Sequence, residues 1–358
     1  MANPASHLLR VPSIRLSPDR PTVGKNLGFL AELSGTWEGE GFNLIARPDR
    51  EGGSPLFLEL NQTFETLSFI PIASLIPNRG SAVEDITLFG LTYLQKVADL
   101  VTKGALHIEP GIWIHVPTQD ENGGTVQSVA RMGTIPHGNS ILAEGTAIRL
   151  HPFTGNPFDP NKVSAANTAP FAVGTPMPIP GTQGGFPPYN LSDATPAAVN
   201  FRTPAGDSPA IPLPAAILGV PMQKVINDPT LLLTAALAGQ TIESMIVINV
   251  ASVPTLQQAE PDKNGKPQPP KTITFNGGGG GLENIPFLQK NADAATVFAT
   301  FWIETIKGPT PDATFSQLQY VQTVFLNFPI ITPNKPPGPN LSWPHVSVAT
   351  LRKTFGGQ

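Results

Sequence analysis

Ser34-Gly35-Thr36-Trp37-Glu38-Gly39-Glu40-Gly41 is the stretch of sequence that decides the fold. Its residues alternate, so that one face of the predicted strand carries Trp37, Gly39 and Gly41 while the other carries threonine and glutamate. Glycine inside a strand weakens it unless the strand bends sharply or another backbone comes close, and a small closed barrel needs sharp bends at its corners. The stretch therefore predicts the opening strand of a closed β-barrel.

A short apolar segment lies directly before this strand. Between Leu27 and Leu33, apolar residues recur at the spacing of one side of a helical turn. Since such a turn leads straight into the predicted opening strand, we expect it to plug one end of the barrel.

Further strand candidates follow at short spacing, and turn residues rather than long helices separate them. Evenly spaced hairpins of this kind favour an antiparallel sandwich or barrel. We predict an all-β protein: an antiparallel closed barrel of about ten strands, of the calycin type, with long Pro/Gly-rich loop insertions and a few short helices. The predicted strands cover Leu56 to Phe69, Asp85 to Val97, Ala105 to Val116, Val126 to Thr134, Ile141 to Leu150, Thr241 to Val253, Ala295 to Ile306, Leu318 to Phe328 and Trp343 to Lys353.

The predicted strands fall into two blocks. We expect a single domain over residues 1–358, with the barrel built from residues 27–150 and 241–354. Between the blocks the chain is rich in proline, alanine, threonine and glycine, and it shows neither the helical nor the strand period. This composition predicts a Pro-rich insertion over residues 151–240.

Two details of the insertions can be predicted. A short helix is expected near residues 229–238, because Asp228-Pro229-Thr230 supplies capping residues and Gly239 follows the apolar run. Residues 254–292 are predicted to form a second loop insertion, in which the segment from Gln257 to Pro270 is a solvated loop because it is rich in proline and lysine.

The composition excludes several classes of function. Glycine (34) and proline (41) make up about a fifth of the 358 residues, only 13% of residues are charged, and the formal net charge is −4 without any basic run, so we expect no nucleic-acid partner. The absence of cysteine excludes disulfides, thiolate metal sites and cysteine nucleophiles. No signal peptide and no long apolar run is visible, so we expect a cytoplasmic protein without a membrane span. The oligomeric state stays open.

The last predicted strand carries the strongest candidate ligand. Ser342-Trp343-Pro344-His345-Val346-Ser347-Val348-Ala349-Thr350-Leu351-Arg352-Lys353 puts His345, Ser347 and Ala349 on one face. Because small residues stand beside the histidine, a flat and bulky ligand could lie there against the imidazole. No Gly-x-Ser-x-Gly elbow and no His-Glu-x-x-His helix occurs, so hydrolase and zinc-protease functions have no support.

Three segments of the chain, taken together, carry a family resemblance. Leu33 to Gly41 has the form Leu-x-Gly-x-Trp-x-Gly-x-Gly, Ala105 to Trp113 contains Leu-His-x-Glu-x-Gly, and His345 to Arg352 forms the closing strand. In order and in strand context they resemble the nitrobindin family of haem-binding barrels. Residues 151–239 and 253–291 have no counterpart in a compact nitrobindin, so the chain resembles an enlarged member whose long loops would cover the barrel mouth, narrow access to it or mediate assembly.

The resemblance implies a cofactor and a site. In that family a ten-stranded barrel holds ferric haem b at its mouth, and the closing-strand histidine is the axial iron ligand. The implied metal ligand is therefore His345, and the implied cofactor-binding residues also include Trp37, His107, Ser347 and Ala349. The implied activities are binding of nitric oxide and isomerisation of peroxynitrite to nitrate.

Two other classes of function stay open. A barrel of this size could carry a fatty acid or another apolar small molecule, with Arg131, Arg149 and Tyr320 as candidate anchors for its carboxylate. Alternatively, the chain could be a structural or interaction module with no ligand, whose contact surface is the Pro-rich insertion.

Overall fold

The computed structural model describes most of the predicted barrel and parts of the insertions. The described residues are 20–48, 57–78, 85–136, 138–151, 166–178, 191, 200–202, 213–253, 255–264, 266–274, 294–308, 310, 313–330 and 336–354. Much of the predicted insertion over 151–240, and residues 275–292 of the second, therefore lie outside the described residues. Within the described part, no helix is long and apolar enough to cross a membrane.

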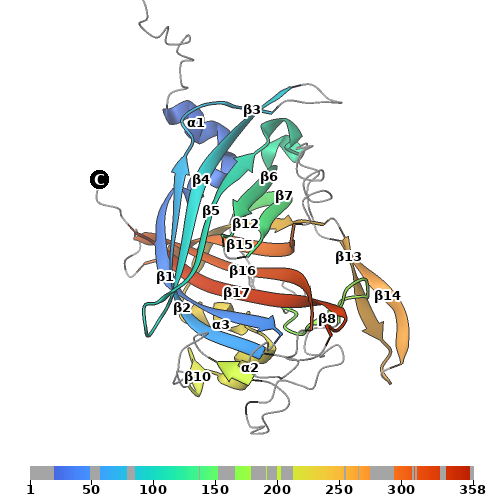
Figure 1. Ribbon diagram of the computed structural model, residues 1–358. Helices are drawn as coiled ribbons and strands as arrows, with labels where there is room; N and C mark the ends of the chain where they lie inside the picture. The colour runs from blue at the N-terminus through green and yellow to red at the C-terminus, as the bar shows by residue number, and fades with distance from the viewer. Residues whose placement is uncertain are drawn as a thin grey trace, which may run out of the picture.

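Ten antiparallel strands form a closed ring, because β2 pairs with β4 as well as with β1 (Figure 1). The prediction of an all-β protein with a closed barrel of about ten strands is confirmed. In order around the ring, the strands are β4 (Ile86–Asp99), β5 (Ala105–His115), β6 (Val126–Thr134), β7 (Ser140–Leu150), β12 (Ile242–Ala251), β15 (Thr296–Lys307), β16 (Thr314–Pro329), β17 (Asn340–Thr354), β1 (Gly35–Arg47) and β2 (Phe57–Pro71).

Several short strands and 3-10 turns lie outside the ring of ten strands. β3 and β9 extend the sheet beside β4 and β2, and β8 pairs with the start of β17. Two short 3-10 turns connect β5 to β6. The bounds are β3 (Ile76–Asn78), η2 (Pro117–Gln119), η3 (Asn122–Gly124), β8 (Phe171–Ala172), β9 (Asn200–Arg202), β10 (Ala216–Ile217) and β11 (Val220–Pro221).

One end of the barrel is closed by the segment before β1. It forms α1 (Arg20–Asn26) and the 3-10 helix η1 (Gly28–Leu33), and its apolar residues are buried in the interior cluster of the barrel. The indole nitrogen of Trp37 donates a hydrogen bond to the Leu33 carbonyl at 2.7 Å, which ties this segment to β1. The predicted plug is therefore present.

The described part of the insertion packs on the outer wall of the barrel. α2 (Met222–Asn227) and α3 (Leu231–Ala236) lie against β1, β2 and β17 (Figure 1), and their apolar side chains share a cluster with outward-facing wall residues such as Phe42 and Val348. α3 falls within the range in which a helix is expected, and the Asp228 carboxylate accepts hydrogen bonds from Thr230 at its start. The described part of the insertion therefore covers the outer wall of the barrel.

The expected loop from Gln257 to Pro270 is instead part of a hairpin. β13 (Thr255–Pro261) pairs with β14 (Pro267–Thr274), and the two form a separate sheet that projects away from the barrel (Figure 1). Proline cannot donate a ladder hydrogen bond, but it is tolerated in a strand whose N–H groups face solvent. In a two-stranded sheet, each strand has one edge whose N–H groups face solvent, so both strands can contain proline. The prediction of a loop was wrong because it took proline as evidence against a strand.

The two strand blocks meet at two pairings, β17–β1 and β7–β12, and the second is the seam beside the insertion. It joins residues on either side of the insertion, with Gly145 opposite Val250. A Cβ atom at Gly145 would lie 1.7 Å from the Asn249 carbonyl oxygen and 2.8 Å from the Val250 Cα atom. Glycine at this position therefore permits the close approach that closes the ring.

Replacement of Gly145 by alanine should weaken the seam. Because the new methyl group would meet backbone that cannot rotate away, we expect Gly145→Ala to lower the free energy of unfolding by about 3 kcal/mol, measured by urea denaturation. Gly24→Ala is the matched control, since a Cβ atom there would meet no atom within 4 Å. Because alanine has a higher helix propensity than glycine, Gly24→Ala in helix α1 should raise the free energy of unfolding by less than about 1 kcal/mol. Equal stability of the two variants would contradict the β7–β12 seam.

Candidate functional site

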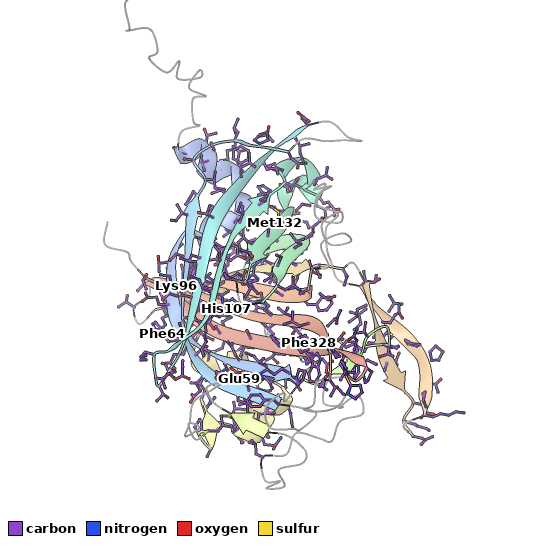
Figure 2. The ribbon with its side chains drawn as sticks, viewed as in Figure 1. Glu59, Phe64, Lys96, His107, Met132 and Phe328 are labelled. Carbon is purple, nitrogen blue, oxygen red and sulfur yellow. The ribbon has the colours of Figure 1, made fainter. Side chains whose placement is uncertain are left out.

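The barrel interior changes character along its axis. Near the plug, it is filled by apolar and aromatic side chains that include Trp37, Trp113 and Phe301. Farther along, the inward positions of β2 are Glu59, Asn61, Thr63 and Glu65, and all four are buried. Figure 2 places Glu59 at the end of the barrel away from α1. The polar part of the interior is where a ligand can be recognised.

His345 lies in this polar part, on the inward face of β17. Ladder pairing sets it between Ile45 of β1 and Val324 of β16, and Ile45 pairs in turn with Glu59. The next two inward positions of β17 are Ser347 and Ala349, and Ala349 belongs to the interior cluster. The predicted face of β17 is thus turned into the barrel.

The two ring nitrogens of His345 have different environments. One ring nitrogen is hydrogen-bonded to the backbone of Ala46. This hydrogen bond raises the pKa of His345, as expected when the ring nitrogen carries the proton and donates it to the Ala46 backbone. The other, Nε2, is buried and has no hydrogen-bond partner among the described residues. Burial lowers the pKa of His345 to about 4, and the positive charges of Arg47 and His107 act in the same direction. At neutral pH, His345 is therefore a neutral imidazole with a free lone pair on Nε2.

A buried ion pair occupies the barrel on the side of β5 and β6. Arg131 donates a hydrogen bond to the Glu109 carboxylate at 2.7 Å and to the Gln322 side chain at 2.6 Å, and the Tyr93 hydroxyl also donates to Glu109. Burial alone would raise the pKa of Glu109, but the Arg131 charge and hydrogen bonds from His107 and Tyr93 outweigh it and bring the pKa to about 2. The pair is therefore charged and internally neutralised.

A second buried group lies on the side of β2. The Tyr320 hydroxyl donates to Glu65 at 2.5 Å, and Gln95 bonds both side chains, at 3.2 Å to Glu65 and 2.9 Å to Tyr320. Burial raises the pKa of Glu65, only partly offset by these hydrogen bonds. Burial thus favours the neutral form of Glu65, and its oxygens accept hydrogen bonds from Tyr320, Gln95 and Thr63.

The structure brings some of the predicted site residues together. One strip of the interior is lined by His345, Ser347 and Ala349. His107 lies 3.5 Å from the Glu109 carboxylate, and it is close enough to His345 to lower the pKa of that histidine electrostatically. Trp37 lies elsewhere, because it pairs with Lys353, eight residues along β17 from His345. That separation is about 26 Å along a strand, which places Trp37 in the plugged end.

The sequence did not single out the buried polar residues of β2. Glu59, Asn61, Thr63 and Glu65 recur with period 2, and such a pattern ordinarily marks the solvent face of a strand. Their apolar neighbours Leu58 and Leu60 face outward beneath the insertion. The period-2 pattern of polar residues is visible in the sequence. Whether that face points into the barrel or to solvent depends on what covers the outer wall, which the pattern does not reveal.

The candidate anchors for a fatty-acid carboxylate are already engaged. Arg131 is neutralised by Glu109, and the Tyr320 hydroxyl donates to Glu65. Arg149 is 41% exposed and pairs with Glu32 near the plug. No two of these three groups converge on a free carboxylate site.

Loss of Arg131 should be costly, because it would leave the Glu109 charge buried without its cation. We expect Arg131→Met to lower the free energy of unfolding by about 3–5 kcal/mol in urea denaturation at pH 7. The double variant Arg131→Met/Glu109→Gln should recover part of that loss, since no buried charge then remains.

The exposed Arg149–Glu32 pair supplies the matched control. Its side chains are 41% and 51% exposed, so Arg149→Met should cost less than about 1 kcal/mol. A similar effect of Arg149→Met and Arg131→Met would contradict the buried and charged state of the Arg131–Glu109 pair.

Comparisons with known proteins add little. No protein-family model and no curated protein matches the chain. Among solved structures, the chain is similar to the crystal structure of Rv2717c from M. tuberculosis, with 10% sequence identity and a TM-score of 0.29 over 92% of this chain and 97% of that chain. At this identity and TM-score, the similarity carries no argument about function.

Proposed function

We propose that this protein binds haem b at the polar end of the barrel, with Nε2 of His345 as the axial ligand of the iron. The observation that carries the proposal is the buried Nε2 atom, which has no partner in the part of the chain that the structure describes, in a ring whose other nitrogen is held by the Ala46 backbone. A metal-binding histidine characteristically donates its second N–H to a backbone carbonyl or carboxylate, which fixes the ring and leaves the ligating lone pair free.

Three residues around His345 bear on the proposal. Ile45 and Val324 flank the ring on the neighbouring strands, so the Nε2 lone pair is kept from water. Arg47 carries a positive charge close enough to His345 to lower its pKa, and its guanidinium lies 3.7 Å from the Glu59 carboxylate and 4.0 Å over the Phe57 ring. Haem brings four nitrogen ligands of its own, so one protein histidine suffices to hold it.

When bound, the haem would supply an iron position for small ligands such as nitric oxide, or for isomerisation of peroxynitrite. His345 would hold the iron, the Ala46 carbonyl would orient the ring, and Ile45 and Val324 would exclude water. A fatty-acid carrier is the second class of function, and the engaged state of Arg131 and Tyr320 speaks against it.

Removal of His345 should abolish specific haem binding. Haemin titrated into the wild-type protein should give a Soret shift that saturates at one haem per chain. His345→Ala should weaken binding by more than the about 10- to 100-fold that loss of a merely supporting residue costs, because the iron–protein bond itself is lost. In His345→Gly, added imidazole should restore the Soret band by occupying the vacated space.

His107→Ala is the control for this test. It removes a second histidine whose charge is felt at His345 but leaves Nε2 of His345 in place. Loss of the Soret band in His107→Ala, together with its retention in a folded His345→Ala variant, would reverse the assignment. Displacement of a fluorescent fatty acid without any Soret shift would favour the carrier.

The pH dependence of haem binding should follow the lowered pKa of His345. Because protonation of Nε2 competes with iron, affinity should stay level from pH 8 down to about pH 5 and fall only as the pH approaches 4. The dissociation constant would be measured from the Soret band across this range, with tryptophan fluorescence as the check on folding. A midpoint near the ordinary histidine value of about 6.5 would indicate an exposed ligand and contradict the site.

A further inference from the structure

A pocket of about 590 Å³ lies outside the barrel, between its wall and the insertion. Its lining residues come from β1, β2, β16 and β17 on the wall side and from α3 and the β10–β11 turn on the other side. Its wall residues include Glu38, Glu40 and Val348, which alternate with the inward-facing Trp37 and Ala349. These outward side chains place the pocket on the outer face of the wall, to which Ala349 of the interior cluster also contributes lining.

The size and the apolar walls of the pocket suit a small molecule. Binding pockets for small ligands usually measure about 300–1,000 Å³ and are mainly apolar with a few polar groups. Ile217 of β10, Leu232 and Leu233 of α3 and Val348 of β17 supply the apolar surface. An alkyl or ring system of modest size would bury its surface there.

Two carboxylates stand at the rim of the pocket. Glu38 and Glu40 lie on the outward face of β1, about 7 Å apart, and both are exposed. Neither has an ion-pair partner among the described residues. Arg352, which pairs with Glu38 in the ladder, places its guanidinium over the Phe315 ring at 4.6 Å instead. Arg352 also lines the pocket, so two carboxylates and one guanidinium stand around it, and their net negative charge suits a cation.

The inner side of the pocket presents an unused acceptor. Gln317 is 1% exposed, and its amide nitrogen is engaged by Gln240 at 3.0 Å and Glu304 at 2.9 Å. Its Oε1 atom is buried and has no hydrogen-bond partner among the described residues. A buried acceptor without a partner costs free energy, and a ligand donor would remove that cost.

Glu304 does not supply a competing charge behind Gln317. Burial raises its pKa to about 8, so this carboxyl is largely protonated at neutral pH. The acidic charge of the pocket thus comes from Glu38 and Glu40, while the inner side offers neutral acceptors. In the ladder, Gln317 and Glu38 both pair with Arg352, so they stand two strand spacings, or about 10 Å, apart.

We propose that this pocket binds an apolar primary amine that carries a second hydrogen-bond donor about 10 Å from its ammonium group. The ammonium group lies between Glu38 and Glu40, the apolar chain lies against Leu232, Leu233 and Val348, and the far donor bonds Oε1 of Gln317. Anions of the same length are repelled at the rim.

The test uses 8-amino-1-octanol as the probe and octanoate as the matched anion, with ligand-observed NMR titration of the full chain. We expect saturable binding of the amino alcohol at one site and at least tenfold weaker binding of octanoate. Glu38→Gln/Glu40→Gln should weaken the amino alcohol about fivefold, the effect of losing two exposed ion pairs. The control Glu243→Gln/Glu260→Gln removes the same net charge elsewhere and should leave the affinity unchanged.

A blocking variant separates this pocket from other sites. Ala236→Phe fills the pocket from α3, and Ala216→Trp fills it from β10 without altering that helix; either should abolish binding. His345→Ala should bind the amino alcohol as the wild type does. Equal binding of octanoate, equal effects of the two charge-removing pairs, or full binding in a folded blocking variant would each overturn the proposal.

Discussion

At one end of the barrel, β1, β2 and β17 are buried on both faces, and both candidate sites depend on this constraint. The outward residues Phe42, Leu44, Leu58 and Leu60 are almost fully buried beneath the insertion. Since the outer wall already provides a hydrophobic core, the inward positions here are free to carry polar side chains. The same cover creates the outer pocket, because α3 meets the wall above the outward carboxylates of β1.

Polar groups inside a barrel must be paired, neutralised or left to a ligand, because desolvation of a lone charge is expensive. Glu109 is paired with Arg131, and burial favours the protonated form of Glu65 beside Tyr320 and Gln95. The lowered pKa of His345 neutralises its ring, yet its Nε2 atom has no hydrogen-bond partner among the described residues. Gln317 shows the same pattern outside the barrel, with its nitrogen engaged and its oxygen unpartnered. Among the buried side-chain atoms without a partner in the described part of the chain, these two are the ones to which we assign a ligand.

The barrel could be predicted from sequence because its signals are local. The alternation with glycine around Trp37 predicts a sharply bent strand, and turn residues separate the later strands, so β6 was placed at its observed bounds. The hairpin of β13 and β14 was missed, because proline argues against a strand unless the pairing partner leaves its N–H side free. Pairing partners are a long-range property that a local composition does not contain.

By itself, the sequence determined the closed antiparallel barrel, the apolar plug before β1 and the face of β17 that carries His345, since each follows from a periodicity along a few residues. Only the tertiary structure decided which side of β2 is the inside. It also decided that Arg131 is matched by Glu109, that Trp37 lies far from His345, and that Nε2 of His345 is buried without a partner in the described ranges. The physical reason is that burial and charge pairing depend on segments distant in the chain, here the insertion packed against the outer wall.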